Sequence, residues 1–153
     1  MSVTPNLSLT KINADDFVSP DPINLAFDII DNLGVDYVVD QGTSGEWWYR
    51  KWKSGRAECG IDHKNFGDLP HTQTWGSVYT SRGLTFGNYP FAFADKPYSI
   101  ISFLGTSDQN HWPYVAQRGS NSTTISSPFA LMDPLSGIAK DATFGIYVCG
   151  RYK

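Results

Sequence analysis

From residue 35 to residue 153 the chain alternates between short apolar or aromatic runs and stretches of turn-forming residues. Strand-like runs occupy residues 37–39, 47–53, 56–61, 75–80, 84–86, 91–94, 98–104, 114–117, 124–126, 129–132 and 143–152. Gly, Pro, Asn, Asp and Ser fill the intervals, and these residue types favour tight turns. Regularly spaced short strands with polar turns are typical of an antiparallel β-sandwich or barrel. We therefore predict an all-β fold, an antiparallel β-sandwich, for residues 35–153.

The runs 47–53 and 56–61 flank Ser54-Gly55, which predicts a hairpin with a two-residue loop. The predicted register places three pairs on the core-facing side: Trp52 with Ala57, Arg50 with Cys59, and Trp48 with Ile61. On the polar side it places Lys51 opposite Glu58, an opposite-charge pair that stabilises antiparallel strands. A shift of one residue would mix the two faces, so this register is a sharp expectation.

Residues 1–34 have a different pattern, and one α-helix is expected near the end of this segment. Asp21 suits the N-cap, Pro22 the first helical position, and Gly34 the termination of the helix. At helical pitch one apolar stripe contains Ile23, Ala26, Phe27, Ile30 and Leu33. The predicted organisation is a short N-terminal segment with a helix, residues 1–34, followed by a β-sandwich domain, residues 35–153.

The apolar surface of this helix is wider than one stripe, because Leu25 and Ile29 extend it to roughly half of the circumference. A helix this short is marginal by itself in water, so it needs to be covered. It either docks on its own β-domain or packs between copies of the chain or against a partner particle. The width of the arc favours the second arrangement, with contacts through Ile23, Phe27, Ile30 and Leu33.

Charge and hydropathy exclude several classes of function. The net charge is −3 and no basic run is present, so nucleic acid is not an expected partner. No apolar stretch approaches the roughly 18 residues of a membrane span, so membrane insertion is not expected. The first residues lack the pattern of a signal peptide, which predicts folding in a cytoplasm. Cys59 and Cys149 are then expected to be free, buried thiols, with a disulfide between them as the alternative.

Parts of the chain resemble a known family. Leu7-Ser-Leu-Thr-Lys11, Asp15-Asp-Phe17 and Phe27-Asp-Ile-Ile-Asp31 are similar to the N-terminal segments of phage tail-fibre and baseplate proteins, although Ile12 stands where those segments usually have Pro. Residues 36–59, DYVVDQGTSGEWWYRKWKSGRAEC, resemble a signature of the C-terminal head domains of phage minor structural and tail-fibre proteins. The run 89–93, YPFAF, matches as well, whereas Gly60 replaces a common aromatic residue.

This resemblance lies within residues 1–104 and fades beyond them. It implies a β-sandwich head, usually a homotrimer, that attaches to other virion proteins by its N-terminus and contacts the host surface at its far end. The implied localisation is the virion, assembled in the bacterial host cytoplasm.

An enzyme is not expected, although hydrolases of cell-surface polymers occur on phage fibres. Glycoside hydrolysis needs two carboxylates roughly 5–10 Å apart. The candidates lie in turn-like stretches, where Asp commonly bonds to the backbone: Asp62, Asp68, Asp95, Asp108, Asp133 and Asp141. Glu46 and Glu58 are the only glutamates, and no Gly-x-Ser-x-Gly or glycine-rich phosphate loop is present. A strand cysteine such as Cys59, even with His63 or His71 nearby, is more often inert than a nucleophile.

No metal or other cofactor is expected. The histidines are His63, His71 and His111, and single ligands from three copies could converge on a threefold axis. Histidines in loops more often have no metal-binding role.

The segment from Ser107 to Tyr114 has the composition of a recognition loop. The expected binding residues are Asp108, Asn110, His111, Trp112 and Tyr114. Aromatic rings stack on the apolar faces of sugars or anchor proteins, while amide and carboxylate groups bind hydroxyls. The alternative is that Trp112 closes the end of the sandwich core.

The resemblance implies a tail-fibre or head-fibre type of virion protein, and the composition of the segment from Ser107 to Tyr114 favours binding of a host-surface glycan or protein. A purely architectural capsid or baseplate component without a receptor is the alternative. A cell-surface polysaccharide hydrolase is the third hypothesis.

Overall fold

The computed structural model of the chain describes residues 20–32, 36–107 and 113–153, and it divides into two units, Met1–Tyr37 and Val38–Lys153. In the first unit the helix α1 spans Pro20–Asn32. It begins at Pro20, one residue before the predicted N-cap Asp21. Proline fits the first helical turn because the N–H that it lacks would have no partner within the helix. Its exposed apolar side chains are Ile23, Leu25, Ile29 and Ile30, whereas Phe27 is half-buried. Leu33 lies outside the described residues.

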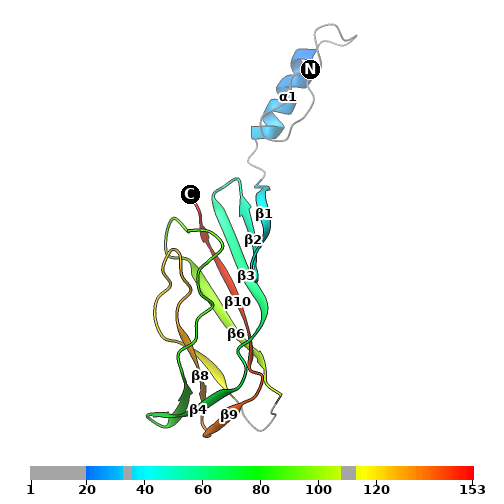
Figure 1. The fold of residues 1–153 in the computed structure, drawn as a ribbon. Coiled ribbons are helices and arrows are strands. Elements are labelled where there is room, and N and C mark those ends of the chain that lie inside the picture. The colour runs from blue at the N-terminus through cyan, green and yellow to red at the C-terminus, as the bar shows by residue number, and fades with distance from the viewer. Residues whose placement is uncertain (1–19, 33–35, 108–112) are drawn as a thin grey trace. The chain divides into compact units, whose positions relative to one another are not determined.

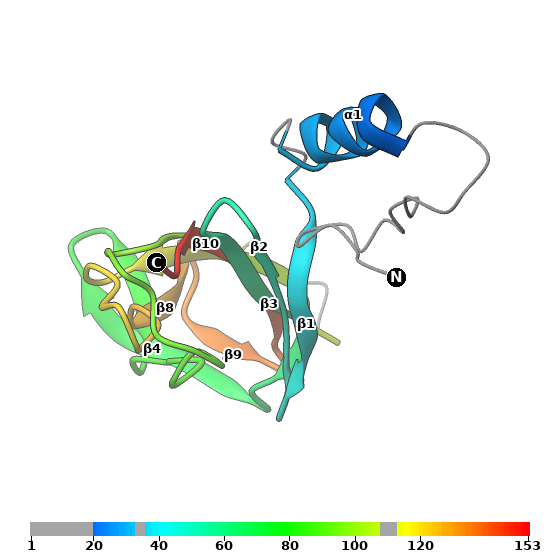
Figure 2. The same ribbon diagram turned by 90° about the horizontal axis from the view of Figure 1, so that it is seen from above.

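The second unit, Val38–Lys153, is a two-layered antiparallel β-structure, so the β-sandwich prediction is confirmed (Figures 1 and 2). Its first sheet has the strand order β1-β2-β3-β10-β6 and its second sheet the order β7-β8-β5-β4-β9. The strands are β1 Val38–Ser44, β2 Trp47–Trp52, β3 Arg56–Asn65, β4 Leu69–Trp75, β5 Val78–Ser81, β6 Tyr98–Gly105, β7 Tyr114–Gln117, β8 Phe129–Asp133, β9 Gly137–Ala139 and β10 Thr143–Arg151.

Aromatic rings fill the space between the two sheets. Phe129 of β8 and Phe144 of β10 are fully buried, and their ring centroids lie 5.2 Å apart. Phe86 stacks on Phe129 at 5.2 Å, and Phe66 meets the same ring edge-on at 5.7 Å. Because these rings come from segments distant in the sequence, the core links both layers of the sandwich.

The register of the β2–β3 hairpin differs from the prediction by one residue. The observed pairs are Trp48–Gly60, Tyr49–Cys59, Arg50–Glu58 and Lys51–Ala57. The loop has three residues, 53–55, instead of two, and Gly55 adopts the left-handed conformation with φ of +89°. Its N–H donates to the carbonyl of Trp52 at 3.0 Å, and its carbonyl accepts from the N–H of Tyr152 at 2.9 Å. The C-terminal residues therefore hold this loop from outside the hairpin.

The shift exchanges the two faces of β2. Trp47 and Tyr49 pack against the core, whereas Trp48, predicted to face inward, lies on the outer face over Gly60. A Cβ on Gly60 would lie 2.7 Å from both the Trp48 ring and the carbonyl oxygen of Ile146, so only glycine fits there.

The predicted pair of Lys51 with Glu58 is not formed. Nζ of Lys51 lies 2.9 Å from Oδ2 of Asp40 and within 4.9–5.6 Å of three ring centroids, those of Tyr49, Phe91 and Tyr152. Glu58 instead accepts a hydrogen bond from the hydroxyl of Tyr147 at 2.5 Å. Lys51 therefore closes one side of the core with an ammonium group held among aromatic rings.

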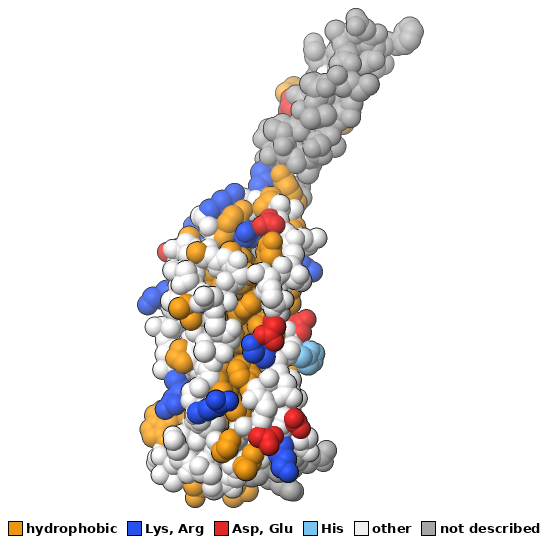
Figure 3. All heavy atoms as spheres, in the orientation of Figure 1, with side chains coloured by type: hydrophobic (Ala, Val, Ile, Leu, Met, Phe, Trp, Pro, Cys, Tyr) orange, Lys and Arg blue, Asp and Glu red, His pale blue; other side chains and the backbone are white. Residues whose placement is uncertain are grey.

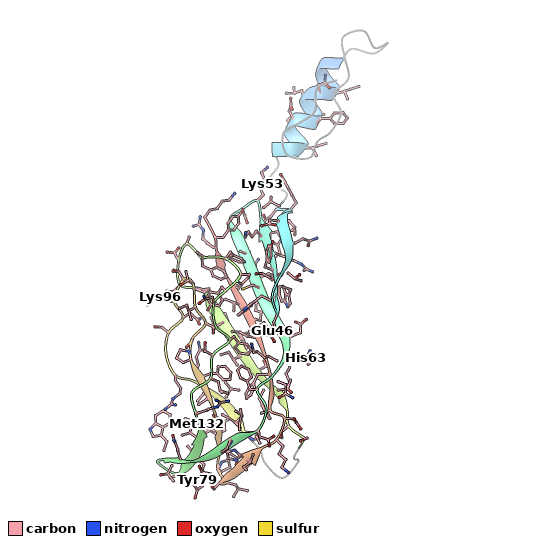
Figure 4. The ribbon with its side chains drawn as sticks, in the orientation of Figure 1. Glu46, Lys53, His63, Tyr79, Lys96 and Met132 are labelled. Carbon is pink, nitrogen blue, oxygen red and sulfur yellow. The ribbon has the colours of Figure 1, made fainter. Side chains whose placement is uncertain are left out.

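A seam of hydrophobic side chains runs along the side of the β unit that Figure 3 shows, with acidic and basic side chains beside it. Among the charged side chains, Glu46, which Figure 4 labels, forms an ion pair with Lys64. Nζ of Lys64 also lies 5.7 Å from the ring centroid of Phe66, so its charge sits beside a core ring. Charged groups therefore lie along the border of the seam.

Three predicted strands, residues 84–86, 91–94 and 124–126, form no ladder. Residues 84–86 and 124–126 each take part in one isolated bridge, between Leu84 and Phe129 and between Asn88 and Ile125. Scattered backbone hydrogen bonds join these segments to their neighbours: the N–H of Phe93 donates to the carbonyl of Thr123 at 2.8 Å, and the N–H of Ala94 donates to the carbonyl of Arg151 in β10 at 2.7 Å. The buried side chain of Asn121, which lies between them in the chain, bonds to Tyr89, Pro97 and Ser99. The prediction of strands at these three places is therefore wrong, because isolated backbone hydrogen bonds take the place of a regular ladder.

Both cysteines are free, as predicted, and Cys59 is fully buried while Cys149 is half-buried. Burial raises the pKa of the Cys59 thiol from 9.0 to about 12, with a smaller contribution from the charge of Glu58. The pKa of Tyr147 also rises to about 12, first because its hydroxyl bonds to Glu58 and then because of burial. The folded β unit therefore retains protons that the unfolded chain would release at high pH.

We expect the free energy of unfolding to fall as the pH rises above 9. The Cys59 contribution is fully present below pH 9 and is lost between pH 9 and 12, because only the unfolded thiol ionises in this interval. The expected loss from this group is about 3 kcal/mol by pH 11. Urea denaturation at several pH values should show a shallower decline for Cys59→Ala than for wild type and for Cys149→Ala. Equal slopes in all three proteins would contradict this assignment.

Candidate functional site

Several connections meet at the end of the β unit opposite the β2–β3 hairpin, here named the distal end. Figure 1 labels β4, β8 and β9 at this end, and Figure 4 shows Tyr79 and Met132 near it, with Lys53 at the other end. Tyr114, the first residue of β7, pairs with Met132 of β8. The predicted recognition segment therefore rejoins the sheet at the distal end.

Large apolar side chains are exposed on the distal elements. The exposed fractions are 60% for Trp75, 47% for Tyr114, 56% for Leu135 and 43% for Ile138. These four side chains are here named the distal surface. The guanidinium carbon of Arg118 lies 5.9 Å from the ring centroid of Trp75. An exposed indole beside a cation offers both a stacking face and hydrogen-bond donors to a ligand.

A tight turn places Trp75 at the tip of the β4–β5 hairpin. Trp75 pairs with Val78, so the loop consists of Gly76 and Ser77 alone, and Gly76 has a φ of +61°. A glycine with positive φ at the first loop position is typical of a type II′ turn. The sequence pattern predicted one continuous strand over 75–80 and so missed this site. The dipeptide Gly-Ser directly after Trp75 is the signal that could have revealed it.

The start of the β6–β7 connection is bonded to neighbouring loops. The N–H of Ser107 donates to the carbonyl of Lys140 at 2.9 Å, and its hydroxyl donates to Oδ2 of Asp141 at 3.1 Å. The N–H of Asp141, whose φ is +51°, donates to Oδ1 of Asp68 at 3.2 Å. Three loops are thus tied together where the predicted recognition loop begins.

A histidine and a carboxylate are buried beneath the distal surface. His71 and Asp133 are both fully buried, with Nε2 and Oδ2 3.9 Å apart. Nδ1 of His71 lies 3.2 Å from the carbonyl oxygen of Leu69, and Oδ1 of Asp133 accepts from the N–H of Leu135 at 2.7 Å. These bonds orient β4 and the β8–β9 turn. In the described part of the chain, no three His, Cys, Asp or Glu side chains are grouped to hold a metal ion.

The predicted binding residues divide into two groups. Asp108, Asn110, His111 and Trp112 lie outside the described residues. Tyr114 is described, and its exposed ring belongs to the distal surface. Trp75, Leu135 and Ile138 are exposed on the other elements of this end, and Arg118 contacts Trp75. The sequence pattern did not mark these four residues as functional.

Several of the carboxylates considered for catalysis bond to the protein itself. Asp62 accepts from the indole N–H of Trp48 at 2.9 Å, while Asp68 and Asp133 each accept from a backbone N–H. Such bonds are typical of aspartates that shape turns and loops. They give these three side chains structural roles.

Comparison with known proteins identifies a shared fold. No protein-family model matches the chain, and no curated protein matches its sequence. A solved structure of the P. aeruginosa R1 pyocin fibre, comprising C-terminal residues 323–701, superposes with a TM-score of 0.51 at 16% sequence identity. The match covers 96% of this chain and 41% of that chain, so this chain spans less than half the length of the fibre fragment. Among the described residues, no helix is long and apolar enough to cross a membrane. The comparison shows that the chain has a fold found in a phage-tail-like fibre.

Proposed function

We propose that this chain is a tail-fibre type of virion protein that attaches by residues 1–34 and binds a host-surface glycan with the distal end of its β unit. The exposed side chains at the distal end carry the proposal, because Trp75 presents an aromatic ring beside the guanidinium group of Arg118 and Tyr114 presents a second exposed ring. Sugars offer apolar ring faces and hydroxyl groups, which match this combination. The shared fold with a pyocin fibre supports the structural class.

The first unit suits attachment. Leu25 and Ile29 of α1 are 61% and 51% exposed, and Ile23 and Ile30 are exposed on another side of the helix. A helix of 13 residues with apolar side chains on several sides gains its stability from packing. We assign that packing to neighbouring copies, in a homotrimer, and to other virion proteins.

The proposed mode of action is binding without catalysis. Asp62, Asp68 and Asp133 each bond to groups of their own chain, which supports structural roles for them. The hydrogen bonds between the loops that contain Ser107, Asp141 and Asp68 favour a rigid surface on which a ligand can bind.

The test is binding of the full-length chain to an immobilised panel of O-antigen, capsular and teichoic-acid polysaccharides, measured by biolayer interferometry. Wild type is expected to bind at least one of them. Trp75→Ala should weaken that binding about tenfold or more, since a stacked aromatic anchor contributes at least 1.4 kcal/mol, the equivalent of a factor of ten. Trp52→Ala is the matched control, because it removes the same side chain from the other end of the unit.

Two results would overturn the proposal: no binding to any polysaccharide, or equal binding by wild type and Trp75→Ala. The first result, together with incorporation into particles, would favour an architectural role. Release of reducing ends from a bound polysaccharide would contradict the non-catalytic mode of action.

A further inference from the structure

The edges of the two sheets meet along one side of the β unit. β6 is an edge strand of the first sheet, and β7 is an edge strand of the second. The side-chain amide of Gln117, the last residue of β7, donates to the hydroxyl of Ser99 in β6 at 3.2 Å. A side-chain bond therefore joins the two layers at the strands where their backbone ladders end.

A groove of about 370 Å³ lies at this junction and is here named the β6–β7 groove. None of the four side chains of the distal surface lines it, and all four are among the described residues. Figure 4 labels Lys96 on one side of the β unit, away from Tyr79 and Met132 near the distal end. The groove is therefore a separate place where a ligand can bind. Its lining includes the side chains of Lys96, Tyr98, Ser99, Gln117, Ser120 and Asn121.

Two buried side chains form the base of the groove, since Ser99 and Asn121 are only 8% and 9% exposed. Nδ2 of Asn121 donates to the hydroxyl of Ser99 at 2.8 Å and to the carbonyl of Pro97 at 3.0 Å. Pro97 and Ser99 flank Tyr98 in the chain, so one buried amide is bonded to the residues on both sides of Tyr98. The Tyr98 ring is thus presented from a fixed position, which lowers the entropy lost when a ligand binds.

The rim of the groove offers an aromatic face and hydrogen-bonding groups. Tyr98 is 65% exposed, which is more than the 60% of Trp75. Gln117 uses one amide N–H on Ser99, and among the hydrogen bonds of the described residues none engages its Oε1. That oxygen can accept from a hydroxyl group of a ligand, and the hydroxyl of the exposed Ser120 can donate or accept. An aromatic ring beside such groups suits a sugar.

The charge of the groove comes from a single ammonium group. Lys96 is exposed and forms no ion pair with another described residue. The described residues that line the groove include no Asp or Glu, and the neighbouring Asp95 is not among them. A lone ammonium suits a carboxylate, whereas phosphate is typically bound by arginine forks or by clusters of backbone N–H groups. The groove therefore favours a sugar that carries a carboxylate.

We propose that the β6–β7 groove binds one acidic sugar unit that carries a carboxylate, as a site additional to the distal surface. The apolar face of the sugar ring stacks on Tyr98, its carboxylate pairs with Lys96, and its hydroxyls bond to Gln117. The volume of the groove lies at the low end of the range for small-molecule sites, which suits a single sugar unit. The inference goes beyond the proposed function, because it requires neither Trp75 nor a role in a virion.

NMR titration of the full-length, ¹⁵N-labelled protein tests the proposal. The probes are glucuronate, galacturonate and N-acetylneuraminate, each added to millimolar concentration. At least one of them should bind and shift the resonances of Ser99, Gln117 and Ser120 more than those of other residues. Tyr98→Ala should weaken this binding about tenfold, because the stacking face is lost. Tyr98→Phe is the matched control and should bind as wild type does, since it keeps the ring.

The charge is tested with the methyl ester of whichever acid binds, because the ester keeps the ring and the hydroxyls but is neutral. Wild type should bind the acid about fivefold more tightly than the ester. Lys96→Gln should bind both equally. Lys140→Gln is the control, since it removes the same charge from an exposed lysine outside the groove, and it should keep the preference.

Three results would overturn the inference: none of the three acids binds, Tyr98→Ala binds as wild type does, or Lys96→Gln keeps the preference for the acid. Binding that is lost in Trp75→Ala and kept in Tyr98→Ala would place the sugar on the distal surface instead. The polysaccharide panel measures the distal surface through Trp75, so either site can fail while the other is supported.

Discussion

Replacing Phe129 by Ala should lower the free energy of unfolding by about 3–5 kcal/mol, the range measured for removing a buried aromatic side chain. The side chain is fully buried and contacts three other rings, those of Phe66, Phe86 and Phe144, at 5.7, 5.2 and 5.2 Å between centroids. Its backbone is held by two hydrogen bonds to Leu84, at 2.8 and 2.9 Å. The strand cannot move inward to fill the cavity, because these bonds fix its position.

Urea denaturation followed by intrinsic fluorescence measures this effect, and the thermal midpoint should fall by roughly 10 °C or more. Trp75→Ala is the control, since it removes a large aromatic side chain that is 60% exposed. Its effect should stay within about 0.5 kcal/mol. A loss below about 1 kcal/mol for Phe129→Ala would show that these rings do not form a continuous packed core.

Replacing Asn121 by Ala should lower the free energy of unfolding by about 3 kcal/mol through lost hydrogen bonds instead of lost volume. Oδ1 of Asn121 accepts from the hydroxyl of Tyr89 at 3.1 Å and from the N–H of Ser127 at 3.0 Å. Its Nδ2 donates to the carbonyl of Pro97 at 3.0 Å and to the hydroxyl of Ser99 at 2.8 Å. The variant leaves these groups buried, and each buried group that loses its partner costs about 1–3 kcal/mol.

The matched control is Asn88→Ala, because Asn88 is exposed and only its backbone takes part in a bridge. Limited proteolysis provides a local measurement beside the global unfolding. Residues 118–128 should become cleavable in Asn121→Ala but not in Asn88→Ala, since Asn121 ties this segment to the first sheet. Equal stability of the two variants would show that the network does not hold these segments.

The distal site and the core depend on each other through β8. Phe129 begins this strand in the core, and Asp133 ends it beneath the distal surface. All five residues of β8 are buried, so the strand connects the packed rings with the turn that presents Leu135. We therefore expect recognition and stability to be separable only for exposed residues such as Trp75.

The sequence by itself determined the class of fold and the position of many elements. The predicted strands 98–104, 114–117, 129–132 and 143–152 correspond to β6, β7, β8 and β10, and the helix was located to within two residues of its start. These elements follow from local periodicity and turn residues, which are properties of neighbouring positions. The free state of both cysteines was also predicted from their local pattern.

Only the tertiary structure decided which face of β2 points inward. Trp47 and Tyr49 alternate with Trp48 and Trp52, so both faces of the strand are aromatic and a period of two does not distinguish them. The choice depends on contacts distant in the sequence, among them the packing of Trp47 in the core and the bond from the Tyr152 N–H to the Gly55 carbonyl. The distal surface has the same origin: Trp75, Tyr114, Leu135 and Ile138 are brought to one end by strand pairing, which no local pattern encodes.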